Sequence, residues 1–223
     1  MLLLVTDTSG KHGSVALARA AEGAKPNEVD LIEETPLVGG TFSAQLVPQI
    51  AALLARHGFS KTDIDAFVVI SGPGSFTGLR VGLAAIKALA EILRKPIVPV
   101  SLLEVVAIAS GAQGKVVAAL DAGRGEFYTG EYEVAGGNAR LLRERLLAND
   151  EFQSTAKGMV VATPDETLAR NLRDGAIQVP LPGAHMIARL GWRKLQAGKT
   201  VTSEQLEANY IRRSDAEIFA KSS

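Results

Sequence analysis

Residues 71–80 read Ser-Gly-Pro-Gly-Ser-Phe-Thr-Gly-Leu-Arg and join two segments of different character. Before them, Ala66–Ile70 is a continuous apolar run, which is typical of a buried parallel strand. After them, apolar residues recur at helical spacing over Gly78–Leu93, and Pro96 follows the end of that pattern. The stretch therefore predicts a strand, a tight turn and a helix, which is the repeating connection of an α/β fold.

The remainder of the first half predicts further strands and helices around this connection. Short apolar runs bounded by turn residues indicate strands, and apolar residues at helical spacing indicate helices. The expected strands are Leu2–Thr6, Ser14–Ala18, Val29–Thr35 and Ile97–Val100, and the expected helices are Ala44–His57 and Leu102–Ala109.

The same order of elements begins again after a glycine-containing turn at 111–115. The expected strands are Val116–Leu120, Glu126–Glu133, Arg140–Leu146 and Met159–Ala162, with a short helix before the last of them and helices at Pro164–Arg173 and Ala184–Gln196. This repetition predicts a duplicated βββαβα unit with two lobes, over residues 1–110 and 111–208. Residues 209–223 are expected to return to the first lobe as an extended arm.

The composition excludes several classes of protein. Lysine plus arginine and aspartate plus glutamate both total 24, which argues against a large nucleic-acid surface on the chain itself. The absence of cysteine excludes disulfides and thiolate chemistry, and three scattered histidines (His12, His57 and His185) do not predict a metal centre. No apolar run is long enough to span a membrane, and the residues up to Asp7 lack the basic start of a signal peptide. A soluble, cytoplasmic protein is therefore expected.

Two turns carry residues that suit either phosphate binding or turn capping. Asp7-Thr8-Ser9 and Asp121-Ala122-Gly123 each place a carboxylate at the end of a leading strand, before a hairpin. Turn amides donate to phosphate oxygens, and a carboxylate is a ligand for magnesium. An aspartate at a strand end equally caps its own turn. Neither stretch has the fuller glycine-rich form of a phosphate loop, so both interpretations stay open.

The turn at 71–80 also has two interpretations. Because it lies between a strand and a helix, its amides are placed to bind an anion. It lacks the closing Gly-Lys-Ser/Thr of a nucleoside-triphosphate loop, and its glycines at 72, 74 and 78 are too widely spaced for a dinucleotide fingerprint. The alternative is a structural turn in which Ser75 or Thr77 caps the helix.

The helix expected at Gly78–Leu93 has a wide apolar surface. One face carries Leu79, Leu83, Ile86, Ala90 and Leu93, and a neighbouring face carries Val81, Ala85, Ala88, Leu89 and Ile92. A helix of this kind in a water-soluble protein must be covered on two sides. One side is expected to pack on the sheet, and the other faces either the helix Ala44–His57 or a partner protein.

Residues 71–82, which extend the turn by Val81 and Gly82, resemble the signature loop and helix of the TsaB (YeaZ) family. Further segments in the family's order are Asp7-Thr8-Ser9, Val100–Glu104, Asp121–Tyr128 and Tyr210–Arg213, so the resemblance covers nearly the whole chain. It implies an actin-like (ASKHA, ribonuclease H-like) fold with two lobes. It also implies a role in forming N6-threonylcarbamoyladenosine beside the anticodon of tRNAs that read ANN codons.

The resemblance further implies that the chain is not itself an enzyme. In this pathway TsaD transfers the threonylcarbamoyl group and carries a metal-binding HxxxH helix, TsaE is an ATPase, and TsaB is a scaffold that binds TsaD. The matching helix begins near 40–45 without a histidine, so no metal or cofactor is expected. The implied partners are TsaD, TsaE and, when TsaD is absent, a second copy, with tRNA reached only through the complex and no membrane involved.

The partner surface implied by the resemblance lies on the helices Ala44–His57 and Gly78–Leu93, which in the family pack with two TsaD helices into a four-helix bundle. The residues expected to form this surface are Leu46, Ile50, Leu53, Phe76, Leu79, Gly82, Leu83 and Ile86. The turn residues expected to be vestiges of phosphate-binding hairpins are Asp7, Thr8, Ser9, Asp121 and Gly123. A charge at Leu79 or Leu83 is expected to abolish partner binding, provided that folding survives.

Two other functions compete with this one. A small-molecule kinase of the same superfamily would use Asp7 and Asp121 around magnesium-ATP, and a metallopeptidase would bind a catalytic metal. The chain lacks full phosphate loops for the first and the ligand pattern for the second.

Overall fold

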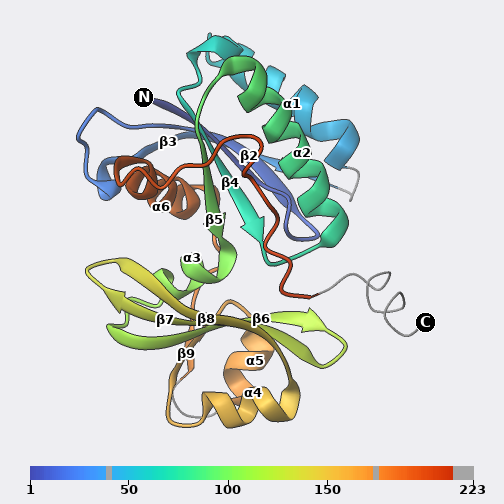
Figure 1. The fold of residues 1–223 in the computed structure, drawn as a ribbon, viewed down its shortest axis with the longest axis vertical. Helices are drawn as coiled ribbons and strands as arrows, with labels where there is room; N and C mark the ends of the chain where they lie inside the picture. Colours follow the sequence, from blue (N-terminus) through green and yellow to red (C-terminus); the bar gives the residue numbers. More distant parts are fainter. Residues whose placement is uncertain (39–41, 173–175, 213–223) are drawn as a thin grey trace. The chain divides into compact units, whose positions relative to one another are not determined.

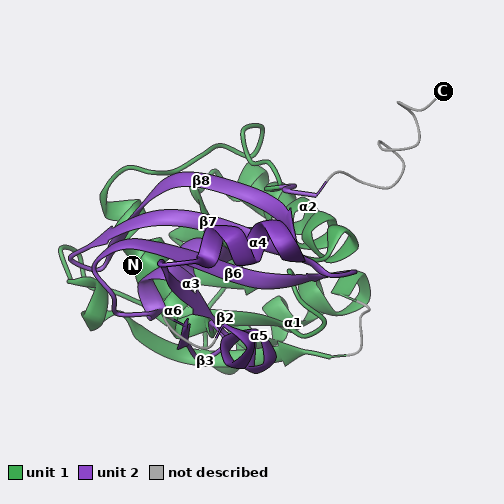
Figure 2. Cartoon of the chain, turned by 90° about the horizontal axis from the view of Figure 1, so that it is seen from below, with its two compact units in different colours: residues 1–101, 183–209 green, residues 102–182, 210–223 purple. Residues whose placement is uncertain are grey.

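The computed structural model describes residues 1–38, 42–172 and 176–212, and these form two compact units. The first unit contains residues 1–101 and 183–209, and the second contains residues 102–182 and the segment that begins at Tyr210 (Figure 2). Each unit has its own five-stranded sheet, with helices on both faces.

The sheet of the first unit has the strand order β3-β2-β1-β4-β5. Its strands are β1 (Leu2–Asp7), β2 (Gly13–Arg19), β3 (Asp30–Leu37), β4 (Ala66–Gly72) and β5 (Ile97–Ser101). The first three strands pair antiparallel, whereas β4 and β5 join them in parallel. Every residue of β4 is buried, as is usual for a central parallel strand that is covered on both faces.

Three helices cover this sheet. Two of them, α1 (Phe42–Arg56) and α2 (Phe76–Leu93), lie on one face, and α6 (Ala184–Gln196) lies on the other (Figure 1). Fully buried side chains of the sheet, including Phe67, meet helical side chains such as Leu53 between the sheet and the α1–α2 pair. On the opposite face, the indole Nε1 of Trp192 donates to the carbonyl of Ala24 at 2.7 Å, which fixes α6 to the loop after β2.

The sheet of the second unit has the strand order β10-β9-β6-β7-β8. Its strands are β6 (Gly114–Gly123), β7 (Glu126–Ala135), β8 (Asn138–Ala148), β9 (Val160–Thr163) and β10 (Ala176–Gln178), and its helices are α3 (Leu102–Ala109), α4 (Asn149–Ala156) and α5 (Glu166–Asn171). Helix α3 packs on one face through residues that include Val106, and α4 packs on the other face through Phe152. Two short 3-10 helices, η1 (Pro26–Glu28) and η2 (Lys61–Asp63), belong to the first unit.

The order of elements confirms the expected α/β class and its duplication. In each unit three antiparallel strands precede a helix, a parallel strand and a second helix. Strand β10 was not expected, because its three residues are too short a run to give a sequence pattern. The expected helix Pro164–Arg173 ends at Asn171 in the described residues, and Arg173 lies outside them. In the described part of the chain, no helix combines the length and the apolar character that a membrane crossing requires.

The division of the chain differs from the expected division at 110 and 208. Helix α3 belongs to the second unit, because Leu103 is fully buried in that unit's core. Helix α6 belongs to the first unit, because it covers the first sheet. The segment up to Asn209 also belongs there, and its Leu206 is buried in the core of the first unit, whereas Ile211 packs in the second. Residues 213–223 of the expected arm lie outside the described residues.

Candidate functional site

The turn after β1 and the loop before α2 are joined by hydrogen bonds. The amide of Ser75 donates to the carbonyl of Ser9 at 2.6 Å. The hydroxyl of Ser75 accepts from the amide of Gly78 at 3.2 Å, so Ser75 is the N-cap of α2. Of the two interpretations of the loop, the structural turn capped by Ser75 is therefore confirmed, and two of the amides at this helix start already have protein acceptors.

Three glycines allow α2 to approach the Asp7–Ser9 turn closely. A Cβ at position 74 would collide with the carbonyl oxygen of Ser9, and one at position 78 would collide with the carbonyl oxygen of Thr8. A Cβ at Gly82 would collide with the side-chain hydroxyl of Thr8. Gly74, Gly78 and Gly82 therefore make room for the hairpin.

Both aspartates cap their own turns, as one of the two sequence interpretations expected. The Oδ1 atom of Asp7 accepts from the amide of Ser9 at 2.8 Å and from its hydroxyl at 2.6 Å. Burial raises the pKa of the Asp7 carboxyl above its usual value, and the two hydrogen bonds from Ser9 oppose this rise. In the second unit, Oδ1 of Asp121 accepts from the amide of Gly123 at 2.7 Å.

Six of the eight residues expected to form the partner surface belong instead to the core of the first unit. Their side chains are at most 5% exposed at the six aliphatic positions Leu46, Ile50, Leu53, Leu79, Leu83 and Ile86. Gly82 is buried against Thr8, and half-buried Phe76 lies beneath the guanidinium of Arg80, 3.7 Å from its ring centroid. The prediction of a partner surface is therefore wrong for the six aliphatic side chains, which pack in the core, and a charge at Leu79 or Leu83 would disrupt folding before it affected a partner.

A second face of the same two helices is exposed and apolar. Val47 of α1 is 52% exposed and Ile92 of α2 is 71% exposed. Small exposed residues accompany them, including Ala51 of α1 and Ala84 and Ala88 of α2. We call this surface, made by Val47, Ala51, Ala84, Ala88 and Ile92, the outer helix face. The second apolar stripe in the sequence of α2, which includes Ala88 and Ile92, was the signal that could have identified it.

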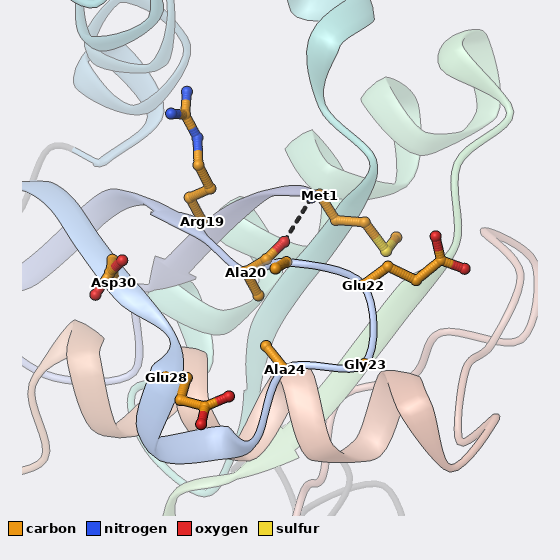
Figure 3. Close-up of a pocket in the computed structure, with 9 residues that line it drawn as sticks. Met1, Arg19, Ala20, Glu22, Gly23, Ala24, Glu28 and Asp30 are labelled. Carbon is orange, nitrogen blue, oxygen red and sulfur yellow. Dashed lines mark hydrogen bonds between the residues drawn. The ribbon is translucent and has the colours of Figure 1, made fainter.

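A hollow of about 200 Å³ lies at the start of α2 in the first unit and is lined by Lys11, Ser43 and Thr77, among others. A larger hollow of about 550 Å³ lies at the end of the β1–β2 pair that is remote from the Asp7 turn and is bordered by the carboxylates of Glu28 and Asp30 (Figure 3). It contains none of the expected site residues.

The Asp121–Gly123 turn of the second unit contacts Arg212, in the segment that follows Asn209. The guanidinium of Arg212 donates to the carbonyls of Ala122 at 2.9 Å and Gly123 at 3.3 Å, and it forms an ion pair with Glu126. It also lies 5.8 Å from the ring centroid of Tyr128. Arg212 therefore contacts its own protein, whereas Arg213 lies outside the described residues. Among the described residues, no group of three His, Cys, Asp or Glu side chains gathers in a metal-binding arrangement.

Comparison with known proteins identifies relatives over almost the whole chain. The family model "TsaD: tRNA N6-adenosine threonylcarbamoyltransferase" matches residues 37–217. The Escherichia coli K12 protein named tRNA threonylcarbamoyladenosine biosynthesis protein TsaB is 30% identical, with 95% of each chain covered. The protein of the same name from Bacillus subtilis 168 is 34% identical over 61% of this chain and 57% of that protein.

Solved structures agree with the sequence comparison. YeaZ from Pseudomonas aeruginosa superposes with a TM-score of 0.73 at 27% identity and covers 94% of this chain and 99% of that chain. A Pseudomonas aeruginosa protein described as similar to the peptidase YeaZ gives a TM-score of 0.74 at 28% identity, with 95% and 99% covered. These relatives confirm the expected actin-like, two-lobed fold, and the chain belongs to the TsaB (YeaZ) family.

Proposed function

We propose that this chain is the non-catalytic partner subunit of a TsaD–TsaB–TsaE assembly that forms N6-threonylcarbamoyladenosine next to the anticodon of tRNAs reading ANN codons. The Escherichia coli relative, which is covered over 95% of both chains, is named for this biosynthesis. In this proposal TsaD performs the transfer, TsaE supplies the ATPase, and tRNA is reached only through the complex. We accordingly place the protein in the cytoplasm.

The outer helix face is the observation on which the proposal rests. Ile92 and Val47 expose most of their apolar side chains, and the alanines beside them allow another helix to approach closely. Removing apolar surface from water stabilises association by about 25 cal/mol per Å² before the costs of ordering the partners. A pair of helices from TsaD would cover this face and complete a four-helix bundle, and a second copy of the chain would cover it when TsaD is absent.

The hydrogen bonds of the Asp7–Ser9 turn and of the loop before α2 also support a role without nucleotide chemistry. The amides of Ser75 and Gly78 donate to protein oxygens, and Oδ1 of Asp7 accepts from Ser9. A phosphate at this turn would therefore have to displace existing hydrogen bonds. On this basis, magnesium-ATP should leave the thermal midpoint of the purified chain unchanged, whereas the kinase alternative requires a rise.

The test uses the full chain co-purified with the TsaD of the same organism. Ala88→Arg and Ile92→Glu place charges on the outer helix face, and both should lose TsaD while keeping the wild-type circular dichroism spectrum. Leu181→Glu is the matched control, because Leu181 is 75% exposed but lies in the second unit, and it should keep TsaD. Light scattering of the chain alone should give a dimer for wild type and a monomer for Ala88→Arg.

Two results would contradict the proposal. One is retention of TsaD by folded Ala88→Arg and Ile92→Glu variants, which would place the interface elsewhere. The other is threonylcarbamoyl transfer to tRNA that proceeds at the full rate when this chain is omitted from a reconstituted reaction.

A further inference from the structure

The outer helix face has charged residues along one side. Arg80, Lys87 and Arg94 recur at intervals of seven residues in α2 and its C-cap, and seven residues make about two turns, so the three cations form one row. Glu91, the single acid of α2, lies in the same row. We call Arg80, Lys87, Glu91 and Arg94 the charged border of the outer helix face.

The charged border lies on the side of α2 away from α1. Gly78 marks the side toward α1, because a Cβ there would lie 3.3 Å from Cε2 of Phe42. Lys87 follows Gly78 by nine residues, which make about two and a half turns, so its side chain leaves α2 on the opposite side. The exposed Ala84 and Ala88 lie between these two sides. Apolar surface is therefore bounded by α1 on one side and by cations on the other.

Two of these cations are not neutralised by the described part of their own chain. Among residues 1–38, 42–172 and 176–212, neither Lys87 nor Arg94 has an ion pair. The Glu91 carboxylate accepts a hydrogen bond from the hydroxyl of Ser203. With three cations and one anion, the charged border presents net positive charge to whatever covers the outer helix face.

A second copy of the chain has no acid that matches these cations. From Phe42 to Ala55, α1 contains no charged residue, and α2 contains only Glu91. Association of two copies through the outer helix face therefore brings the charged border against either another charged border or an uncharged helix. Like charges that meet across an interface oppose association, and so do cations that lose water without gaining a carboxylate.

We propose that the charged border favours a different protein, whose helices carry carboxylates opposite Arg80, Lys87 and Arg94, and that it weakens self-association through the same face. This inference rests on the proposed function, in which the protein is TsaD, and adds the charge that the TsaD helices present. The exposed Ile92 favours a protein over tRNA, because binding to phosphates leaves an apolar side chain uncovered. Specificity of this kind combines attraction to one partner with repulsion from another.

Reversing one charge should change the two associations in opposite directions. Lys87→Glu leaves two cations and two anions on the charged border. It should weaken TsaD binding by about three- to tenfold, because an exposed attraction becomes a repulsion. It should tighten self-association by at least as much, because the change occurs in both copies.

Lys157→Glu is the matched control. Lys157 is exposed and lies in the second unit, and its reversal changes the net charge equally, so neither association should change. Titration calorimetry with the TsaD of the same organism measures the first association, and sedimentation equilibrium of the chain alone measures the second. Circular dichroism checks that both variants are folded.

Salt should separate the two associations of the unmodified chain in the same way, so the test does not depend on one variant. Between about 0.1 M and about 1 M NaCl the screening length falls from about 10 Å to about 3 Å. TsaD binding should therefore weaken, whereas self-association should strengthen. Lys87→Glu should lose most of both salt dependences.

The inference is overturned if folded Lys87→Glu binds TsaD as tightly as the unmodified chain does, or if its self-association does not tighten. Binding of tRNA by the chain alone that Lys87→Glu abolishes would show that the charged border binds phosphates instead. Failure of the proposed function gives a different result. In that case the unmodified chain binds no TsaD at any salt concentration, or folded Ala88→Arg and Ile92→Glu variants keep it, and this inference fails with it.

Discussion

Thr8 lies where the hairpin after β1 meets helix α2. Its carbonyl oxygen faces Gly78 and its side-chain hydroxyl faces Gly82, so one residue of the hairpin contacts two successive turns of α2. Thr8 is only 2% exposed, which leaves it little freedom to move away from a new methyl group. The positions of the two glycines are therefore set by a long-range contact and not by the local preference of the helix.

Gly82→Ala is expected to destabilise the protein by about 1–3 kcal/mol, the usual cost of forcing extra volume into a packed interior. Because the new Cβ meets side-chain atoms of Thr8, adding Thr8→Ala should recover much of that loss. Gly78→Ala meets the backbone oxygen of Thr8, so Thr8→Ala should not rescue it. Urea denaturation of the four variants measures these differences, and equal rescue of both alanines would contradict the geometry.

The residues of the Asp7 turn show what sequence can and cannot predict about this site. Turn capping by Asp7 follows from the known tendency of aspartate to accept the amide two residues later. The contacts of Thr8 with α2 could not be predicted, because they depend on how the hairpin and the helix pack. The position of the loop between a strand and a helix suggested an anion site, because sequence alone does not show whether the amides at a helix start face a ligand or a neighbouring backbone.

Strand β3 and the end of α1 are joined by a polar cluster around Glu33. The Arg56 guanidinium donates to the Glu33 carboxylate at 2.5 Å, and Nε2 of His57 lies 2.8 Å from it. Hydrogen bonds from Arg56, then from His57, lower the pKa of Glu33 to about 2, since they favour its charged form. The cluster is exposed to solvent, so its effect on stability is limited by screening.

Glu33→Gln should reduce stability at neutral pH and make no difference under strongly acidic conditions. A carboxyl group with a lowered pKa stabilises the folded state above its unfolded pKa, and that stabilisation disappears as the pH falls through the folded value. The difference between wild type and variant should therefore disappear between about pH 4.5, the reference value, and about pH 2. Thermal midpoints across this range provide the measurement, and a difference that persists at the acid end would refute the assignment.

At the scale of elements, sequence periodicity located the helices but not their environment. The helices expected at Ala44–His57 and Gly78–Leu93 correspond to α1 and α2. Two faces of α2 are apolar, and periodicity does not say which of them the sheet covers. Packing places Leu79 in the core and leaves Ile92 exposed. The prediction that Leu79 belongs to the partner surface is therefore wrong.

At the scale of the molecule, the first unit is assembled from two separate parts of the chain. Residues 102–182 intervene between its fifth strand and α6. Local patterns cannot reveal such an insertion, because Ala184–Gln196 has the same amphipathic character wherever it packs. The buried side chains of α6, not its order in the chain, assign it to the first sheet.

Phe152→Ala is expected to destabilise the second unit by about 3–5 kcal/mol, the usual cost of removing a buried phenylalanine ring. Phe152 is fully buried on the α4 side of the second sheet, and its ring centroid lies 4.7 Å from that of Phe127. Amide hydrogen exchange should show faster exchange in β6 and β9, with β1 and β4 less affected. Equal acceleration in both sheets would mean that the two cores unfold as one.

The buried indole of α6 gives this molecule a built-in optical label. Trp192 is the single tryptophan of the chain and lies in the first unit, whereas all three tyrosines (Tyr128, Tyr132 and Tyr210) lie in the second. Excitation at the red edge of the absorption band, where only indole absorbs, therefore reports on the first unit alone. Emission that shifts to longer wavelength marks the moment at which water reaches that sheet, without any introduced dye.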